Sequence, residues 1–210
     1  CEVFVGAGSQ AEYGRVAGKL SSATPAFPEN GYGMAKLCAG QMSRVECAAL
    51  GMKHIWVRIL SVYGEYDGEG SLISSTVRKL LDGKPTELTA CEQVWDYIYA
   101  ADAAGILRRL SVMGRDGGVY CLGSGEARPL REYVEKIRDC VSPSSSLGFG
   151  VLPYPEGQVT YLCADTSELV RDIGELKLTP FEVGIRRTVE WIRRERRAKG
   201  EKDKYNGSLL

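Results

Sequence analysis

Short apolar runs alternate with amphipathic segments along most of the chain. The run from His54 to Val62 is almost continuously apolar, as in a parallel strand that is covered on both faces. Alternation of such runs with helical patterns predicts an α/β protein with a parallel sheet. The expected extended segments are Val3 to Ala7, His54 to Val62, Thr86 to Ala90, Tyr97 to Tyr99, Gly118 to Gly123, and two pieces between Val151 and Leu162.

Helices are predicted where apolar residues recur every three or four positions. Asn30 precedes one such segment, and Ser71 precedes another that meets a stop signal at Gly83. The predicted helices are Tyr32 to Leu50, Ser71 to Asp82, Ala101 to Met113, Leu130 to Val141, a segment capped by Asp165 that runs to Asp172, and a last one that begins at Pro180.

A phenol and an ammonium occupy one face of the helix predicted after Asn30. Tyr32 and Lys36 are four residues apart, so their Cβ atoms would lie about 5 to 6 Å from each other. A tyrosine ordinarily loses its proton near pH 10, which is about three units too high for proton transfer at neutrality. A cation about 4 Å away would contribute about 4 kcal/mol toward the charged form. The pair therefore predicts a proton-transfer site.

Ser9 is expected beside this pair. It follows the strand predicted at Val3 to Ala7, and ligands of open α/β sheets bind at the carboxyl ends of strands. The segment from Arg15 to Gly31 contains glycines and prolines and reads as a loop that returns the chain to that edge. The glycines of VGAGSQAEYG also suggest a phosphate-binding turn. That turn requires a helix to begin within it, whereas a polar loop follows here.

Composition narrows the class of protein. The chain has 210 residues, 44% of them hydrophobic and 26% charged, with a net charge of zero, which argues against a nucleic-acid surface. No run of 18 apolar residues is present, so no membrane span is expected, and no basic, apolar leader opens the sequence. We expect a cytoplasmic protein. Because the chain opens on a strand at Cys1, we expect a fragment.

Metal and disulfide chemistry are not expected. The single histidine, His54, has no ligand partners at usable spacing. The seven cysteines are scattered and include no C-x-x-C pair, which favours reduced thiols. Asp96 and Asp102 are expected to act as caps or loop anchors rather than acids.

The order of these motifs resembles an extended short-chain dehydrogenase/reductase of the NAD-dependent epimerase/dehydratase family, in its nucleotide-sugar branch. The resemblance covers nearly the whole chain. It rests on Ser9, the AEYG that follows it, YGMAK at Tyr32 to Lys36, VRILSVYG at Val57 to Gly64, WDYIY at Trp95 to Tyr99, and LGSG at Leu122 to Gly125. The implied fold is the C-terminal part of a Rossmann-like doubly wound parallel sheet plus a small α/β substrate-binding lobe. The N-terminal glycine-rich part would be lacking.

The resemblance also implies domains and partners. Residues 1–65 would be the C-terminal half of a dinucleotide-binding domain. Residues 66–210 would be mainly a substrate-binding lobe, with the segments around 95–123 returning to the main sheet. The expected ligands are NAD or NADP, with NAD favoured, and a nucleotide sugar. A homodimer would form through the helix from Tyr32 to Leu50.

Site residues follow from the resemblance. The expected catalytic residues are Ser9, Tyr32 and Lys36. Tyr32 and Lys36 would also bind the cofactor, together with Leu60, Ser61 and Val62. The expected substrate-binding residues are Ser9, Gln10, Ser71, Leu72, Trp95 and Gln158.

Departures from the family pattern affect the reaction and the substrate. Dehydratases carry an Asp-Glu pair where this chain has Gln10 and Ala11, so dehydration is disfavoured. Several 4-epimerases have arginine at the position of Trp95, and an Arg and an Asp at Pro155 and Gln158. Substitutes for the diphosphate-binding groups would be Arg58, Arg78 or Arg128.

Three functions are therefore open. The first is an NAD(P)-dependent nucleotide-sugar epimerase that transfers a hydride reversibly at a sugar carbon, with a tyrosine as acid and base. The second is an NAD(P)H-dependent ketoreductase of a deoxysugar pathway. The third is a truncated relative without catalysis. We expect the fragment alone to be inactive.

Overall fold

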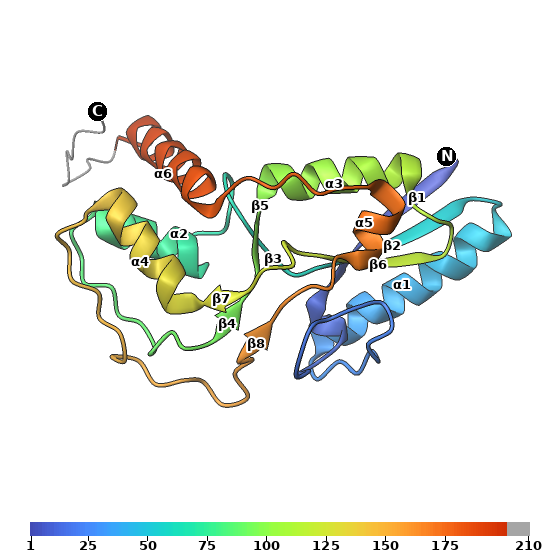
Figure 1. Ribbon diagram of the computed structural model, residues 1–210, viewed down its shortest axis with the longest axis horizontal. Coiled ribbons are helices and arrows are strands. Elements are labelled where there is room, and N and C mark those ends of the chain that lie inside the picture. The colour runs from blue at the N-terminus through green and yellow to red at the C-terminus, as the bar shows by residue number, and fades with distance from the viewer. Residues whose placement is uncertain (201–210) are drawn as a thin grey trace. The chain divides into compact units, whose positions relative to one another are not determined.

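The computed structural model describes residues 1–200 (Figure 1). The chain folds into two compact units. Unit 1 comprises Cys1–Val62, Trp95–Ala127 and Tyr161–Leu178. Unit 2 comprises Tyr63–Val94, Arg128–Thr160 and the described residues from Thr179 onward. Within residues 1–200, no helix is both long enough and apolar enough to cross a membrane.

A three-stranded parallel sheet forms the centre of unit 1. Its strands lie in the order β1 (Val3–Ser9), β2 (Lys53–Ile59) and β6 (Gly118–Leu122). Val5 is paired with Ile55, and Val57 with Tyr120. The prediction of one strand from His54 to Val62 is wrong in one respect. The chain leaves the sheet at Leu60 and continues as β3 (Ser61–Tyr63), which pairs with β5 (Tyr97–Tyr99).

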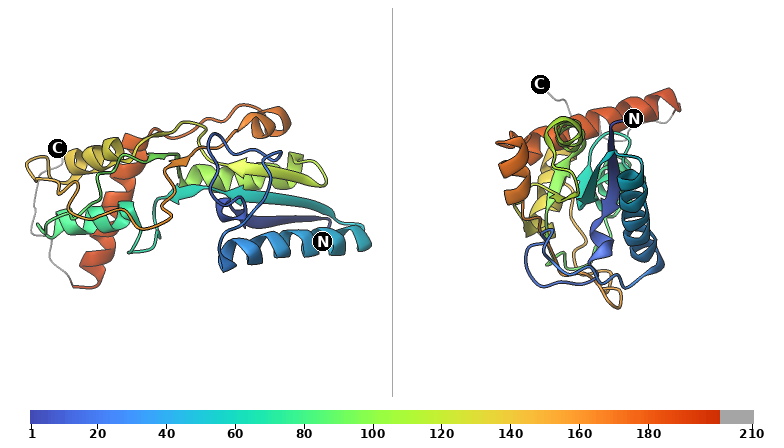
Figure 2. Two further views of the ribbon diagram at one scale, coloured as in Figure 1. Left: turned by 90° about the horizontal axis from the view of Figure 1, so that it is seen from below. Right: turned by 90° about the vertical axis from the view of Figure 1, so that its right-hand side faces the viewer.

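Helices cover both faces of this sheet. The helix α1 (Gly31–Ala49) lies on one face, while α3 (Ala100–Met113) and α5 (Ser167–Ile173) lie on the other (Figure 2). The second face encloses the core residues Ile55, Val57, Ile98, Ile106, Leu110, Leu122, Leu169 and Ile173. Burial on both faces explains why β2 is apolar along nearly its full length.

The indole of Trp56 fills the space between the sheet and α1. It is only 6% exposed, and glycines surround it on both sides. A Cβ atom on Gly8 would lie 2.4 Å from the Trp56 Nε1, and one on Gly40 would lie 2.7 Å from its Cε2. Because any side chain at these positions would overlap the indole, the glycines determine how closely α1 approaches the strands.

Two helix starts predicted from capping residues are confirmed. The Asn30 side chain accepts a hydrogen bond of 2.8 Å from the Gly33 N–H at the start of α1. Ser71 accepts one of 3.1 Å from the Ser74 N–H at the start of α2 (Leu72–Leu81). Such bonds satisfy N–H groups that have no partner within the helix, so the cap fixes where the helix begins.

A long loop between β1 and α1, residues 14–30, is tethered to distant parts of unit 1. We call it the strap. Leu20 forms a parallel bridge with Ala164, in which its N–H donates to the Cys163 carbonyl and its carbonyl accepts from the Asp165 N–H, each at 2.8 Å. The Lys19 ammonium donates to the Gly125 carbonyl at 3.0 Å. The strap is therefore ordered by non-local bonds, despite the turn-forming composition that predicted a loop.

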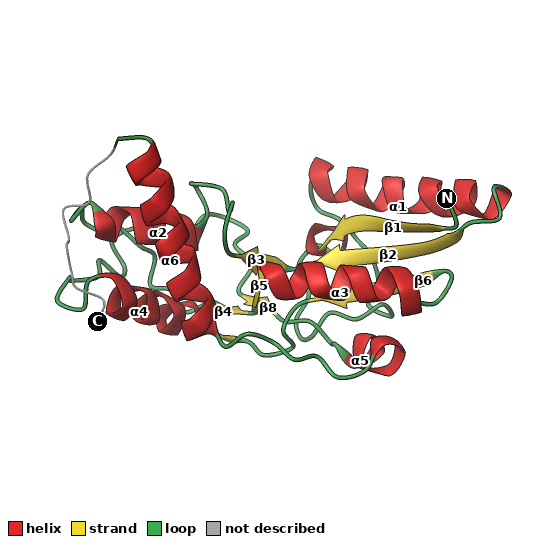
Figure 3. Cartoon of the chain, turned by 90° about the horizontal axis from the view of Figure 1, so that it is seen from above, coloured by secondary structure: helices red, strands yellow, loops and turns green. Residues whose placement is uncertain are grey.

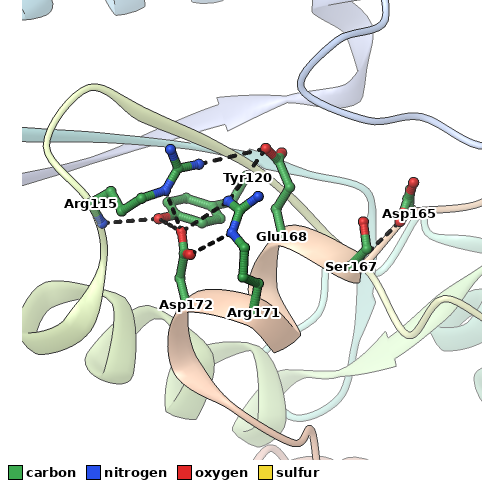
Figure 4. A network of polar contacts seen from close by, with 7 residues as sticks. All are labelled: Arg115, Tyr120, Asp165, Ser167, Glu168, Arg171 and Asp172. Atoms are coloured by element: carbon green, nitrogen blue, oxygen red, sulfur yellow. Dashed lines mark hydrogen bonds and ion pairs between the residues drawn. The ribbon is translucent and has the colours of Figure 1, made fainter.

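A polar network attaches α5 to the sheet (Figure 4). The Asp172 carboxylate accepts hydrogen bonds from the Tyr120 hydroxyl at 2.6 Å, the Arg115 Nε at 2.7 Å and the Arg171 Nε at 2.8 Å. The Arg171 guanidinium, the Tyr120 hydroxyl and Arg115 hold the pKa of Asp172 well below its usual range, despite burial. Arg115 precedes β6, so this network lies at the end of the sheet opposite the carboxyl ends of the strands.

Unit 2 is built around three helices that lie together in Figure 3, namely α2, α4 (Leu130–Val141) and α6 (Phe181–Ala198). The rings of Tyr133 and Phe181 meet edge to face with centroids 4.7 Å apart. Three further strands contain two residues each. They are β7 (Arg128–Pro129) in unit 2, β8 (Tyr161–Leu162) in unit 1, and β4 (Val94–Trp95), where the chain passes from unit 2 to unit 1.

Three sequence predictions need correction. No strand forms at Thr86 to Ala90, where Glu87 makes only an isolated bridge with Gly148. Of the two extended pieces expected between Val151 and Leu162, only β8 is present. The helix assigned to Asp165 begins at Ser167, although the Asp165 carboxylate accepts from the Ser167 N–H at 2.9 Å. In each case the local pattern was too short to determine the element's partners.

Candidate active site

The carboxyl end of β1 is in direct contact with the first turn of α1. After Ser9 the chain forms a single 3₁₀ turn, η1 (Gln10–Glu12). A Cβ atom on Gly33 would lie 2.2 Å from the carbonyl oxygen of Ala11, so only glycine allows this approach. Tyr32, the second residue of α1, therefore lies beside this turn, with its side chain exposed.

Lys36 links the strand to Tyr32. Its ammonium donates a hydrogen bond of 2.9 Å to the carbonyl oxygen of Ala7 and lies 5.8 Å from the centroid of the Tyr32 ring. The sequence predicted that Tyr32 and Lys36 share a helix face at this edge of the sheet. The structure adds that a backbone carbonyl of β1 holds the ammonium in place.

Ser9 is the last residue of β1 and the N-cap of η1. Its Oγ accepts a hydrogen bond of 3.2 Å from the Ala11 N–H, and its own N–H donates to the Glu12 carboxylate at 2.8 Å. This reciprocal pair is a capping box. Ser9 is thus fixed at the strand end from which Lys36 is also held.

Glu12 is a buried carboxylate that the sequence analysis did not identify. It has no exposed surface and accepts from the Trp56 Nε1 at 3.0 Å and the Arg58 Nε at 2.7 Å. The Arg58 guanidinium also lies 4.4 Å from the centroid of the Tyr13 ring. Arg58 was a candidate for binding a diphosphate. That expectation is wrong, because the guanidinium is buried against Glu12 and Tyr13.

A second phenol near this edge is enclosed. The Tyr13 hydroxyl donates to the Ser21 carbonyl at 2.7 Å and lies 3.0 Å from the Cys121 Sγ. Burial, and then the neighbouring Cys121, raise the pKa of Tyr13 above its ordinary value. Burial raises the pKa of Cys121 to about 11. Both groups are therefore protonated near neutral pH and serve the packing of the strap.

The structure brings together Trp95 and Ser61, two residues that were expected to bind different ligands. The Trp95 Nε1 donates a hydrogen bond of 2.7 Å to the Ser61 Oγ. Leu60 beside them is buried with Tyr13, and its N–H donates to the Leu122 carbonyl at 2.9 Å. Val62 packs against the core of unit 1. Within this expected cofactor segment, the side chains of Leu60 and Val62 thus contribute to packing.

The expected substrate-binding residues belong to both units. Gln10 is the first residue of η1 in unit 1, and it is half-buried. In unit 2, Ser71 caps α2, Leu72 is the first residue of that helix, and the Gln158 amide donates to the Val159 carbonyl at 3.0 Å. The side chains of Ser71 and Gln158 thus have local partners within unit 2.

Asp96 anchors loops, as the sequence suggested. Its buried carboxylate accepts from the Ser124 N–H at 2.7 Å and hydroxyl at 2.6 Å, and from the N–H groups of Gly125 and Ala164 at 3.0 Å each. Across residues 1–200, no three His, Cys, Asp or Glu side chains are grouped so that they could hold a metal ion.

The amino-acid sequence of the chain was compared with those of known protein families and proteins. Residues 1–123 match the model of the NAD dependent epimerase/dehydratase family. The chain is 27% identical over 184 residues to a dTDP-glucose 4,6-dehydratase of Xanthomonas campestris, covering 83% of the chain and 52% of the relative. The chain thus spans about half the length of the curated relatives it matches.

Solved structures show the same fold. RMD from Pseudomonas aeruginosa complexed with NADPH superposes with a TM-score of 0.83 at 19% identity, covering 91% of this chain and 66% of that one. The UDP-glucose 4-epimerase of Thermotoga maritima with UDP-glucose gives 0.82 at 21% identity, covering 92% and 64%. The Rossmann-like α/β fold and the resemblance to extended short-chain dehydrogenases/reductases are thereby confirmed. With more than half of its residues matched to the family model, the chain belongs to the NAD dependent epimerase/dehydratase family.

Proposed function

We propose that the chain carries the catalytic and substrate-binding part of an NAD(P)-dependent nucleotide-sugar epimerase. One observation supports this most directly. The Lys36 ammonium is bound to the Ala7 carbonyl beside Tyr32, at the strand end where Ser9 is fixed. A phenol, an ammonium and a hydroxyl at the carboxyl edge of a parallel sheet form a proton-transfer site for a bound alcohol.

Each of these three side chains has a distinct proposed role. Tyr32 takes the proton from a sugar hydroxyl and later returns it, because its phenol is exposed at the edge of the sheet. Lys36 places a positive charge beside the phenol, because its ammonium is held 5.8 Å from the centroid of the Tyr32 ring. Ser9 donates a hydrogen bond to the same sugar oxygen. Reversal of these steps on the opposite face of the sugar carbon would complete an epimerisation.

The residues present fit the nicotinamide side of a dinucleotide. The Tyr32 and Lys36 side chains would hold the ribose of that half, and the backbone of the segment from Leu60 to Val62 would lie against the ring. When bound, NAD(P) accepts a hydride from the sugar carbon and returns it. A pyrophosphate site does not fit after β1, because its glycines lead into η1 rather than into a longer helix.

The substrate is proposed to be a nucleotide sugar. The similarity of the chain to a dTDP-glucose dehydratase and a UDP-glucose epimerase supports this proposal. Gln10 and Trp95 of unit 1 are the proposed contacts, and the roles expected for Ser71, Leu72 and Gln158 of unit 2 stay predictions. Gln10 and Ala11 replace the acidic pair that dehydration would use, so epimerisation is favoured over dehydration.

A ketoreductase of a deoxysugar pathway is the second candidate. Its support is the structural likeness to RMD, which was solved with NADPH. The same three side chains would serve, but the cofactor would leave oxidised after each turnover. A sugar substrate with a free keto group distinguishes the two candidates, because only a reductase consumes stoichiometric NAD(P)H with it.

Homodimer formation through α1 is also proposed. The outer face of this helix exposes Met34, Met42 and Val45 by 54%, 67% and 62%. Cys38 and Ala39 lie between them and are also exposed. An apolar stripe three and four residues apart on a helix is typical of a face that another helix covers.

The test is turnover by the complete natural polypeptide that carries this sequence. UDP-glucose and dTDP-glucose are incubated with NAD⁺, and the products are identified by NMR. Tyr32→Phe should lower turnover by about a hundredfold or more, since general acid–base catalysis contributes at least that much. Cofactor affinity should change little, because Lys36 would still hold the ribose. Tyr66→Phe is the matched control, because Tyr66 is 86% exposed in unit 2. A fully active Tyr32→Phe variant would contradict the proposed site.

A further inference from the structure

The Glu12 carboxylate is completely enclosed and satisfied by donors on both oxygens. Oε1 accepts from the Ser9 N–H at 2.8 Å, and Oε2 accepts from the Arg58 Nε at 2.7 Å. The Trp56 Nε1 lies 3.0 Å from one oxygen and 3.1 Å from the other. A Cβ atom on Gly8 would lie 2.5 Å from Oε1, so the strand leaves room for this carboxylate.

Stability alone does not explain this ion pair. Removing two charges from water costs several kcal/mol per ion, and an apolar pair of similar volume is often as stable or more so. Here the pair lies directly beneath the residue that ends β1. The Arg58 side chain is fixed in turn by the Tyr13 ring, 4.4 Å away. The carboxylate is therefore held from three directions, and the only main-chain N–H group that it is found to bind within residues 1–200 belongs to Ser9.

The effect on Ser9 follows from the hydrogen-bonding capacity of a hydroxyl. A serine Oγ can donate once and accept twice. The Ala11 N–H occupies one acceptor position at 3.2 Å, while Glu12 holds the Ser9 backbone. This capping box leaves the O–H free to donate to a ligand beyond the turn. It also prevents the hydroxyl from rotating away without breaking the Ala11 bond.

We propose that Glu12 is a positioning residue that fixes Ser9 as a hydrogen-bond donor at the carboxyl end of β1. Glu12 acts through Ser9 and does not contact the reacting atoms. The catalytic consequence rests on the proposed function, whereas the positioning is a property of the chain that can be measured without turnover.

Two double variants that differ only in the acceptor test the positioning. The first variant combines Glu12→Gln with Arg58→Met and removes both charges. The oxygen of the Gln side chain can still accept a hydrogen bond from the Ser9 N–H. Glu12→Val with Arg58→Met also removes both charges, and it removes the acceptor as well. Neutral pairs at such sites generally fold, so both variants should give a native protein.

The measurement is residue-specific amide exchange by NMR on this chain, with Ile55 in β2 as the internal reference. The Ser9 amide should exchange about tenfold or more faster in the Val variant than in the Gln variant, while the Ile55 amide differs little between them. Asp96→Asn is the control for loss of another buried carboxylate of unit 1. It should accelerate exchange at Ser124 and Gly125 and leave Ser9 unchanged. Equal Ser9 protection in the two double variants would overturn the inference.

Turnover of the complete natural polypeptide then tests whether the positioning of Ser9 by Glu12 affects catalysis. The Val variant should lose about tenfold or more in kcat with little change in KM for the sugar nucleotide, and the Gln variant should keep most of its kcat. Equal kcat values in the two variants would overturn the role of Glu12 in catalysis. Absence of turnover in the unchanged protein would instead refute the proposed function, and the exchange data would still decide whether Glu12 positions Ser9.

Discussion

The Lys36 ammonium donates a hydrogen bond of 2.9 Å to the Ala7 carbonyl, and this bond joins the first turns of α1 to the end of β1. A lysine on a helix surface ordinarily moves freely in water. Here the charge is tied to the strand, 5.8 Å from the centre of the Tyr32 ring. A main-chain carbonyl group therefore helps to build the proton-transfer site. Substitutions of Lys36 test the role of its charge.

Lys36→Met should lower turnover at pH 7 by about a hundredfold or more in the complete natural polypeptide, because the site loses the cation that is held beside the phenol. Lys36→Arg keeps the charge and should retain more activity than the methionine variant. Turnover rates of the three proteins at pH 7 give the comparison. Equal activity of the unchanged protein and the Met variant at pH 7 would contradict the assignment.

Met42→Glu should separate the proposed homodimer, because it places a charge in the middle of the exposed apolar stripe of α1. Sedimentation velocity on the unchanged chain and the variant measures the change in mass. Val112→Glu on α3 is the control, since Val112 is 75% exposed outside that stripe. A monomeric unchanged chain, or a Met42→Glu variant that stays dimeric, would count against this interface.

Gly40→Ala should destabilise unit 1 by about 1–3 kcal/mol, because the added methyl group would lie 2.7 Å from the Trp56 ring. Gly105→Ala is the matched substitution within α3, where the new Cβ meets no atom within 4 Å. It should stabilise the helix by up to about 1 kcal/mol. Urea unfolding of both variants measures the difference. Equal effects would show that the indole does not limit the approach of α1.

His54 should make stability depend on pH between about 5 and 7. Burial, and then the nearby Arg44, lower the pKa of His54, while Asp116 opposes them in part. The folded state thus binds a proton less readily than the unfolded state, whose histidine titrates near pH 6.5. Stability is highest above that value and falls as the pH decreases below it, by at most about 1.4 kcal/mol per pH unit.

Because His54 is the single histidine, His54→Phe isolates its effect. The phenyl ring can occupy the stack between Phe4 and Trp56, whose centroids lie 5.6 and 6.1 Å from that of His54. The free energy of unfolding should fall from pH 7.5 to 6.5 and 5.5 more steeply for the unchanged protein than for the variant, because only the unchanged protein takes up a proton at residue 54 on unfolding. Parallel profiles would show that His54 does not titrate differently on folding.

Asp172→Asn should cost about 1–3 kcal/mol, because the carboxylate loses charge-assisted bonds from Tyr120, Arg115 and Arg171. Since the pKa of Asp172 is depressed, its contribution is complete above about pH 4 and is lost as the pH falls through the pKa of the folded state. Glu168→Gln is the control, with arginines 3.6 and 3.7 Å away and an expected effect below about 1 kcal/mol. Equal losses at neutral pH would refute the central role of Asp172.

The sequence predicted the elements whose signals are local. Asn30 and Ser71 marked the helix starts, and the continuous apolar run of β2 indicated a strand buried on both faces. Tyr32 and Lys36 could be placed together because four residues make one helical turn. Non-local pairing could not be deduced in this way. The segment from Thr86 to Ala90 has strand-forming residues, but Gly148, with which Glu87 forms a bridge, lies far along the chain.

Two features of the sequence point to the buried carboxylate of Glu12, although neither was used to predict it. The spacing from Ser9 to Glu12 is that of a capping box, and Arg58 is a charged residue inside the apolar run from His54 to Val62. Either feature alone is common at a protein surface. Their partnership depends on the parallel pairing of β1 with β2, which places Gly8 opposite Arg58. That register could not be deduced from local spacing.

The bridge between Leu20 and Ala164 has a consequence for synthesis on the ribosome. Leu20 is translated well before its partners Cys163 and Asp165, which lie more than 140 residues further along the sequence. Until then the strap lacks these bonds in the nascent polypeptide. Translation must therefore pass residue 165 before the loop after β1 can acquire its final surroundings.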